Sequence, residues 1–377
     1  MRPRGSAGAQ SIAVVIAGGG TGGHLYPGIA VAHEIARRMP GARVTFAGTA
    51  QGLEARAVPR EGFELDVIRS SGLKGKSLLS RVRGAALLAP GLWDAWRIIS
   101  RRRPDVVIGV GGYSSGPVVL MAAARRRRTL VLEQNAVPGL TNRLLARVVD
   151  AAAVSYQDTL RFFGGRGIVA GNPVRTEFFT SQPAAAGMAP PRVLILGGSQ
   201  GAHAINVAAV AAAADMARGT SGLEIVHQTG VRDELWVREQ YAAAGVRARA
   251  ERFLDPVVPE VMSADVVICR AGATTLAELA AACRPAVLIP FPAATDDHQR
   301  RNAEVLVDAG AAVMLEEKHL TGETLASRID ALLNDPAGLA IMSAAMRRFA
   351  RPDAAARIVD RLLDVAGVSG GARVARA

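Results

Sequence analysis

The chain has 377 residues, a formal net charge of +12 and 50% hydrophobic residues, which is too long for one ordinary core and fits two domains. Its two cysteines, Cys269 and Cys283, are too few for a disulfide framework, so we expect a reduced, cytoplasmic protein. No uncharged stretch reaches the roughly 18 residues that a membrane span requires, so we expect no transmembrane helix.

Short apolar runs alternate with Ala-rich helical stretches in both halves, a pattern typical of doubly wound parallel α/β sheets. Strands are predicted at 12–17, 43–47, 64–68, 105–110, 129–132 and 151–154. The second half repeats the pattern, with strands near 192–196, 223–227, 249–253, 265–268, 286–289 and 311–314. The turn at 171–174 and the Ala/Pro-rich residues 183–191 indicate a junction and a connector. We predict domains over 11–173 and 174–350, with a helix near 352–366 packing back on the first.

The first predicted strand runs into the glycine loop Gly18–Gly23, which opens a helical stretch. Such a loop lets backbone N–H groups and the positive end of the helix dipole approach a phosphate. Its spacing also matches the dinucleotide fingerprint, which requires an acid at the end of the second strand to hold the ribose. Residues 43–49 contain no acid, so a nicotinamide or flavin cofactor is disfavoured.

His24 follows this loop directly, at the expected start of the helix. The helix dipole disfavours a protonated ring there, so a neutral imidazole that accepts a proton fits this position. A structural cap, or a hydrogen bond that orients a ligand, fits it as well. A general base and a positioning group therefore both remain open for His24.

Residues 73–97 form a basic amphipathic stretch that ends in Trp93 and Trp96, and Pro90 is expected to divide it into two short helices. The other apolar residues are Leu78, Leu79, Val82, Leu87, Leu88 and Leu92, and they alternate with Lys74, Lys76, Arg81, Arg83 and Arg97. An apolar face with tryptophans and a basic border is typical of interfacial helices, although a core-packed helix shares the pattern. Because the excess positive charge lies in residues 1–173, we expect docking on an anionic membrane. No basic–aromatic motif indicates a nucleic-acid partner.

Polar and glycine-rich loops follow several predicted strands. Gly111–Pro117 and Glu133–Asn135 lie beyond the carboxyl ends of two strands, where open α/β sheets bind ligands. Gly197–Ala202 repeats the first glycine turn at the start of the second half. We expect these loops to contact ligand rather than to pack a core.

Residues 270–278 combine a strand end, a turn of small residues and a helix that begins with threonines and carries Glu278 one turn in. The turn suits a diphosphate, and the carboxylate can accept hydrogen bonds from two ribose hydroxyls. A capping box between Thr274 or Thr275 and Glu278 is the structural alternative. Residues 296–302 follow the next strand and suit sugar hydroxyls. No second set of spaced ligands accompanies them, so no metal site is expected.

In this order and spacing, seven segments resemble the MurG family of peripheral membrane glycosyltransferases. This family moves N-acetylglucosamine (GlcNAc) from UDP-GlcNAc to undecaprenyl-diphosphate-MurNAc-pentapeptide (lipid I), which makes lipid II. The segments are Gly18–His24, Gly111–Pro117, Glu133–Asn135, Asn172–Arg175, Gly197–Ala202, Arg270–Glu278 and His298–Asn302. The resemblance covers nearly the whole chain. It implies the GT-B fold, in which two Rossmann-like, doubly wound α/β domains face a cleft. The first domain then faces the membrane and takes the acceptor, and the second binds UDP-GlcNAc.

The resemblance also implies individual roles. It assigns donor and phosphate contacts to Thr21, Gly22 and Gly23, sugar-nucleotide contacts to Asn135 and Arg175, the diphosphate to Ser199, and a backbone contact with uracil to Leu254. It assigns the diphosphate and ribose to Ala273, Thr274, Thr275, Leu276, Ala277 and Glu278, and the GlcNAc hydroxyls to His298 and Gln299. The implied reaction inverts the anomeric centre and uses no metal or cofactor. His24 is the candidate base.

The implied partners are UDP-GlcNAc, lipid I, an anionic membrane surface and other proteins of cell-wall synthesis. The implied location is peripheral, on the cytoplasmic face of the cell's inner membrane, with a role in peptidoglycan synthesis, cell shape and division. Two alternatives stay open: a GT-B transferase with another lipid acceptor, and a UDP-GlcNAc 2-epimerase, which shares the architecture but needs no lipid surface. Labelled UDP-GlcNAc distinguishes them, because an epimerase forms UDP-ManNAc without acceptor.

Overall fold

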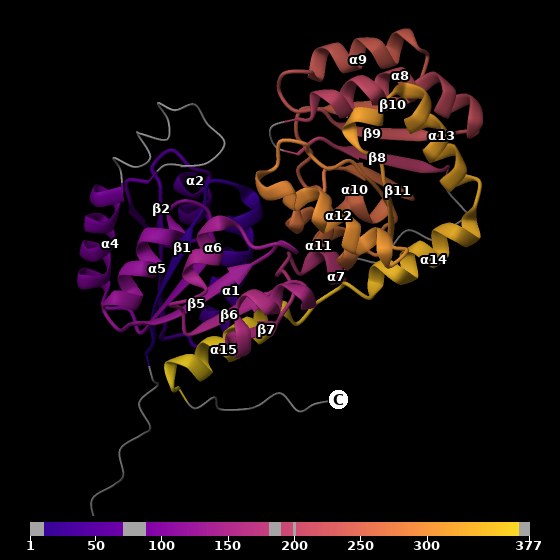
Figure 1. The fold of residues 1–377 in the computed structure, drawn as a ribbon. Helices are drawn as coiled ribbons and strands as arrows, with labels where there is room; N and C mark the ends of the chain where they lie inside the picture. The colour runs from indigo at the N-terminus through magenta and orange to yellow at the C-terminus, as the bar shows by residue number, and fades with distance from the viewer. Residues whose placement is uncertain (1–10, 71–87, 181–189, 199–200, 369–377) are drawn as a thin grey trace, which may run out of the picture. The chain divides into compact units, whose positions relative to one another are not determined.

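The computed structural model describes residues 11–70, 88–180, 190–198 and 201–368, and the chain divides into two compact units (Figure 1). Unit 1 contains residues 1–173 and 353–377, and unit 2 contains residues 174–352. Within the described parts of the chain, no helix is both long and apolar enough to cross a membrane.

Unit 1 is built on a parallel sheet of seven strands in the order β3-β2-β1-β4-β5-β6-β7. The strands are β1 (Ala13–Gly18), β2 (Arg43–Gly48), β3 (Glu64–Val67), β4 (Val106–Gly111), β5 (Arg128–Glu133), β6 (Ala151–Val154) and β7 (Gly167–Val169). Its helices are α1 (Gly22–Arg38), α2 (Glu54–Arg60), α4 (Leu88–Arg102), α5 (Ser115–Ala124), α6 (Leu140–Leu145) and α15 (Ala354–Ala366), with 3₁₀ turns η1 (Gln157–Phe162) and η2 (Gly164–Arg166).

Unit 2 has a parallel sheet of six strands in the order β10-β9-β8-β11-β12-β13. The strands are β8 (Arg192–Leu196), β9 (Glu224–Gln228), β10 (Ala248–Glu251), β11 (Val266–Cys269), β12 (Ala286–Leu288) and β13 (Ala312–Met314). Its helices are α7 (Glu177–Thr180), α8 (His203–Gly219), α9 (Glu234–Ala243), α10 (Val258–Ser263), α11 (Ala273–Ala282), α12 (His298–Asp308), α13 (Gly322–Leu333) and α14 (Pro336–Arg347), with 3₁₀ turns η3 (Thr295–Asp297) and η4 (Glu317–His319).

The two sheets confirm the prediction of doubly wound parallel α/β units. Every predicted strand is present, with its ends within about two residues of the expected positions, because buried parallel strands are continuous apolar runs. β7 was not predicted, since its three residues are only half-buried. The prediction that Pro90 separates two helices is wrong, because α4 contains Pro90 in its first turn, where a missing N–H costs no helical hydrogen bond.

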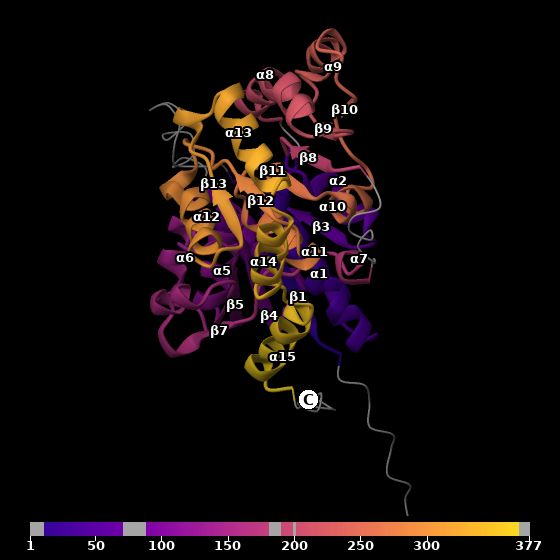
Figure 2. The same cartoon turned by 90° about the vertical axis from the view of Figure 1, so that its right-hand side faces the viewer.

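Alternate residues of β1 pack into different cores on the two faces of its sheet. Val14 and Ile16 belong to the core that contains residues of α1 and α15, whereas Val15 and Ala17 belong to the core formed with α4 and α5. Both faces of the strand are therefore covered. α15 lies along α1 (Figure 2), and the Arg38 guanidinium is 2.6 Å from Asp360 Oδ1.

Leu362→Ala is expected to destabilise the protein, because Leu362 of α15 is fully buried in the core of unit 1. Truncating a buried leucine typically costs about 2–5 kcal/mol in the free energy of unfolding. Urea denaturation should show a lower midpoint for this variant. Ile341→Ala is the control, since Ile341 is 70% exposed on α14. Equal midpoints for the two variants would mean that packing of Leu362 contributes nothing to the free energy of unfolding.

Candidate active site

The predicted site residues of unit 1 lie at one edge of its sheet. β1 ends at Gly18 and α1 begins at Gly22, so Thr21, Gly22, Gly23 and His24 occupy the connecting loop and the first helical turn. β4 and β5, which follow β1 in the sheet, end at Gly111 and Glu133, next to the other predicted loops. Carboxyl ends of neighbouring parallel strands form the ligand-binding edge of such sheets.

A hydrogen bond to Gln134 fixes the tautomer of His24. The Gln134 amide donates from Nε2 to the Val110 carbonyl at 3.1 Å, so its Oε1 faces His24 Nδ1 at 3.2 Å. Because Oε1 can only accept, Nδ1 carries a proton, and Nε2 is the basic nitrogen of the neutral ring. Gln134 lies in a loop that was expected to contact ligand, but its side chain is buried and bonds to His24 and Val110.

The loop of Asn135 is held by a second buried residue, Glu133. One Glu133 oxygen accepts from the backbone N–H and the side-chain amide of Asn135, both at 3.0 Å. The other accepts from Gly139 N at 3.2 Å and Asn142 Nδ2 at 2.9 Å. Burial raises the pKa of Glu133 above its usual value, although these hydrogen bonds oppose the shift. Glu133 therefore fixes the orientation of the Asn135 amide.

Two helices of unit 2 begin beside the carboxyl ends of the neighbouring strands β8 and β11. The turn after β8 includes Gly197, whose N–H donates to the Gln228 carbonyl at 3.0 Å, and α8 then begins at His203. The predicted diphosphate residue Ser199 lies outside the described residues. α11 begins at Ala273 after the N-cap Gly272, and no side chain caps it. The capping-box alternative for residues 274–278 is therefore wrong.

Glu278 and Arg175 form an ion pair, with 3.0 Å between Oε1 and Nη2. The Arg175 guanidinium also lies over the Phe178 ring, 5.3 Å from its centroid. Burial raises the pKa of the Glu278 carboxyl above its usual value, and the Arg175 charge opposes this shift. The structure thus brings together two residues whose roles were predicted separately.

The backbone of Leu254 is held by a hydrogen bond to Gln228, a residue to which no role had been assigned. Its backbone N–H donates to Gln228 Oε1 at 3.1 Å, and Gln228 is itself buried at the end of β9. A backbone contact between Leu254 and uracil would therefore use the carbonyl oxygen. Through its own carbonyl and its side chain, Gln228 connects the Gly197 turn with the Leu254 loop.

The two predicted sugar-binding residues present opposite hydrogen-bonding groups. His298 Nδ1 is 2.7 Å from the Thr295 carbonyl, so it donates there, and Nε2 is the acceptor nitrogen of the neutral ring. Gln299 Oε1 accepts from Phe291 N at 2.9 Å, so a ligand contact by Gln299 would use the Nε2 donors. Among the described residues, no group of three His, Cys, Asp or Glu side chains could hold a metal ion.

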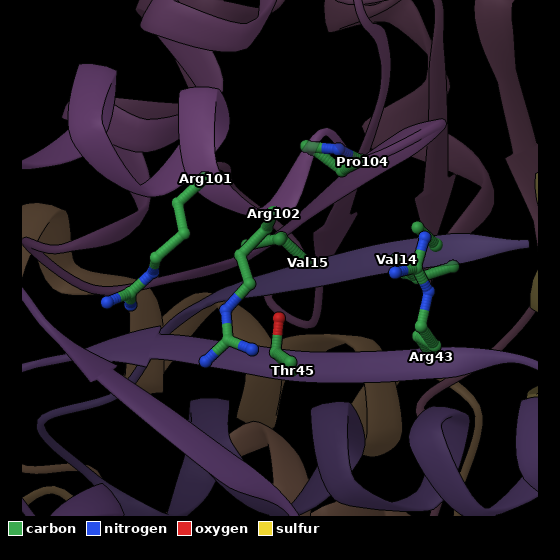
Figure 3. Close-up of a pocket in the computed structure, with 8 residues that line it drawn as sticks. Val14, Val15, Arg43, Thr45, Arg101, Arg102 and Pro104 are labelled. Carbon is green, nitrogen blue, oxygen red and sulfur yellow. The ribbon is translucent and has the colours of Figure 1, made fainter.

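A small pocket lies at the other edge of the unit 1 sheet, where β1 and β2 begin (Figure 3). Arg43, Arg101 and Arg102 line it together with Thr45. Arg101 and Arg102 both pair with the buried carboxylate of Asp66. None of the predicted site residues lines this pocket.

Models of two protein families match the chain. The model of the glycosyltransferase family 28 N-terminal domain matches residues 14–154, and the model of the C-terminal domain matches residues 192–358. Similar proteins from Anaeromyxobacter dehalogenans, Geotalea daltonii and Myxococcus xanthus are 48%, 44% and 43% identical over 93% of this chain, which corresponds to 92%, 96% and 92% of their own lengths. Each is named UDP-N-acetylglucosamine–N-acetylmuramyl-(pentapeptide) pyrophosphoryl-undecaprenol N-acetylglucosamine transferase.

Solved structures share the fold. The crystal structure of Acinetobacter baumannii MurG matches with a TM-score of 0.77 and 30% identity, covering 94% of this chain and 99% of that one. A calicheamicin glycosyltransferase, CalG4, and a UDP-N-acetylglucosamine 2-epimerase each match with a TM-score of 0.70, at 18% and 13% identity. The first covers 96% of this chain and all of that one, and the second covers 97% and 99%. The predicted GT-B fold class is confirmed.

Proposed function

The chain belongs to glycosyltransferase family 28, and from this premise we propose that it transfers GlcNAc from UDP-GlcNAc to the C4 hydroxyl of lipid I. The product is lipid II, the precursor used in peptidoglycan synthesis. The observation that carries this proposal is the similarity, over almost the full chain, to relatives named for this transfer. We assign the acceptor to unit 1 and the sugar-nucleotide mainly to unit 2.

The donor-binding assignment uses the loops of unit 2. Glu278 accepts hydrogen bonds from the ribose hydroxyls, and the Leu254 carbonyl accepts from the uracil ring. The turn before α11 and the N-terminus of α8 take the diphosphate, since helix N-termini favour anions. His298 and Gln299 contact the GlcNAc hydroxyls as acceptor and donor, in keeping with their hydrogen bonds to Thr295 and Phe291. Asn135 and the loop at 21–23 complete the assigned contacts from unit 1.

Transfer requires removal of one proton and stabilisation of the leaving group. The C4 hydroxyl of the acceptor attacks C1 of GlcNAc in line, the bond from C1 to the UDP oxygen breaks, and the anomeric centre inverts. His24 Nε2 takes the hydroxyl proton, while Gln134 holds the ring through Nδ1. The charge that develops on UDP is stabilised by the dipoles of α8 and α11 and by Arg175. Preorganised dipoles commonly lower barriers by about 3–4 kcal/mol for each donor.

Incubation of the purified protein with labelled UDP-GlcNAc, with and without lipid I, tests the proposal. We expect labelled lipid II and UDP only when lipid I is present. Formation of UDP-ManNAc without acceptor would instead indicate the epimerase activity named for one structural neighbour. Transfer to a different polyprenyl-linked acceptor, with none to lipid I, would be consistent with the family but would show that the proposed acceptor is wrong.

We further propose that unit 1 docks on the cytoplasmic face of the membrane. Trp93 and Trp96 are 55% and 41% exposed on α4, and their rings stack with centroids 4.9 Å apart. The Arg125 guanidinium lies over the Trp96 ring, with 5.7 Å from its carbon to the ring centroid. Arg97, the next residue after Trp96, is exposed. Aromatic side chains with basic neighbours favour the interface of an anionic bilayer. Residues 71–87, which contain the rest of the predicted segment, lie outside the described part of the chain.

Replacing apolar and basic side chains of the predicted 73–97 segment should weaken binding to vesicles that contain anionic lipid. The tested residues are Trp93 and Trp96, each changed to Ala, and Lys74, Lys76, Arg81 and Arg83, each changed to Gln. Each basic residue should contribute up to roughly 1 kcal/mol, and less at high salt. Co-sedimentation measures the loss, and calorimetry should show unchanged affinity for UDP. Leu235→Ala, at an exposed leucine of unit 2, is the control. Equal sedimentation of all variants would contradict docking through this segment.

A further inference from the structure

We propose that Glu54 is a positioning residue that holds the first glycine loop in place through its buried carboxylate, and with it Thr21 and His24. Glu54 is the first residue of α2 and is fully buried. It had no predicted role, and the transfer mechanism above does not use it. The proposed effect on catalysis depends on the proposed function, whereas the effect on the loop does not.

Both carboxylate oxygens of Glu54 accept hydrogen bonds from loops that follow strands. Oε2 accepts from the backbone N–H of Gly20 at 2.8 Å, in the loop after β1. Oε1 accepts from the N–H and the hydroxyl of Thr49, each at 2.8 Å, in the loop after β2. The carboxylate therefore connects the two loops that follow these adjacent strands.

Glu54 is ionised at neutral pH. Its burial alone would raise the pKa, but the N–H groups of Gly20 and Thr49 outweigh that effect and hold the pKa below its usual value. A buried charge of this kind is stable only when donors surround it. Removing the charge therefore weakens the hydrogen bonds that connect the two loops.

Glycines make room for the carboxylate. A Cβ atom at Gly19, Gly48 or Gly52 would lie 2.4, 2.5 or 2.2 Å from an atom of Glu54. At these distances the Glu54 side chain or the backbone would have to shift. Gly19 and Gly20 also have positive φ angles of 146° and 86°, a region that favours glycine. The sequence analysis associates the glycines of the first loop with a phosphate. Gly19 instead makes room for the Glu54 carboxylate, and the Gly20 N–H already donates a hydrogen bond to that carboxylate.

On its other side, the loop is packed against the turn after β4. A Cβ at Gly112 would lie 2.4 Å from the Gly19 carbonyl oxygen, and a Cβ at Gly111 would lie 2.7 Å from His24 Nδ1. The loop is therefore enclosed between Glu54 and the second glycine turn. Without the hydrogen bond from Gly20 to Glu54, the loop can move, and His24 at its end moves with it.

Glu54→Gln tests the proposal, because the amide keeps the size but loses the charge and places N–H groups against N–H donors. Hydrogen–deuterium exchange of peptides covering residues 17–25 should be faster than in the wild type, and this measurement requires no substrate. The kcat of transfer should fall by about 10- to 100-fold, and the pH profile that depends on His24 should change. Unchanged exchange, or a rate reduced only in proportion to the folded fraction with a wild-type pH profile, would overturn the proposal.

Asp150→Asn is the matched control. Asp150 accepts from the N–H and the hydroxyl of Thr129 at 2.8 and 2.9 Å, the same pair of donors that Thr49 supplies, but at the opposite edge of the sheet. The Asp150→Asn substitution should lower the free energy of unfolding. It should leave the hydrogen–deuterium exchange of residues 17–25 and the pH profile of transfer unchanged. Should Glu54→Gln not fold, Glu54→Asp, which keeps the charge but shortens its reach, must show the same faster exchange. If the wild type transfers no GlcNAc, the proposed function fails while the exchange result still decides the role of Glu54.

Discussion

His24→Ala is expected to lower the rate of GlcNAc transfer by about a hundredfold or more, with little change in donor affinity. General base catalysis commonly contributes about 10²–10⁴-fold. The hydrogen bond that Nδ1–H donates to Gln134 Oε1 leaves Nε2 as the basic nitrogen of the neutral ring, which is the nitrogen this role requires. Transfer rates measured at saturating lipid I, together with calorimetry of UDP-GlcNAc binding, separate the two effects.

The pH dependence of the rate distinguishes a base from a positioning group at His24. The wild-type rate should rise with pH through one ionisation that the variant lacks, since only the neutral ring can accept the proton. His33→Ala is the control, because His33 lies on the same helix but pairs with Glu61 at the surface. A variant that keeps the wild-type profile, or loses donor affinity in proportion to its rate, would make His24 a positioning residue.

Glu278→Gln should weaken UDP binding by about 1–3 kcal/mol, or roughly 5- to 150-fold in Kd. The neutral amide is a weaker acceptor for the ribose hydroxyls and loses the ion pair with Arg175. Isothermal calorimetry with UDP measures the change. Glu260→Gln is the matched control, since Glu260 also pairs with an arginine, Arg192 at 2.6 Å, but lies near the start of β8. Unchanged UDP affinity in folded Glu278→Gln would contradict the ribose assignment.

The Glu278→Gln variant should not lose stability, although its affinity for UDP falls. Burial raises the pKa of Glu278 in the folded protein, so its protonated form favours folding, and ionisation at neutral pH reduces the free energy of unfolding. A neutral glutamine removes that cost, and Arg175 stays hydrated because it is partly exposed. The melting temperature at pH 7 should therefore equal or exceed that of the wild type. A lower melting temperature would show that the ion pair stabilises the unit.

The strands and the loops that carry the site could be predicted from the sequence for a local reason. A parallel strand covered by helices on both faces is a continuous apolar run, and residues such as Val14, Val15 and Ile16 are all buried. The glycines that follow Ala17 and Leu196 identify the turns at the strand ends. β7 escaped prediction because a short, half-buried edge strand lacks that local signal.

Three hydrogen-bond pairs near the predicted site residues were decided by tertiary structure alone. His24 and Gln134 are 110 residues apart, Arg175 and Glu278 are 103 apart, and Gly20 and Glu54 are 34 apart. Strand order brings such residues together, and strand order has no local signature in residue types. The sequence therefore determined which chemical groups stand at the strand ends, whereas the fold decided which nitrogen of His24 is basic, which oxygen of Glu278 is engaged, and that a buried carboxylate holds the first glycine loop.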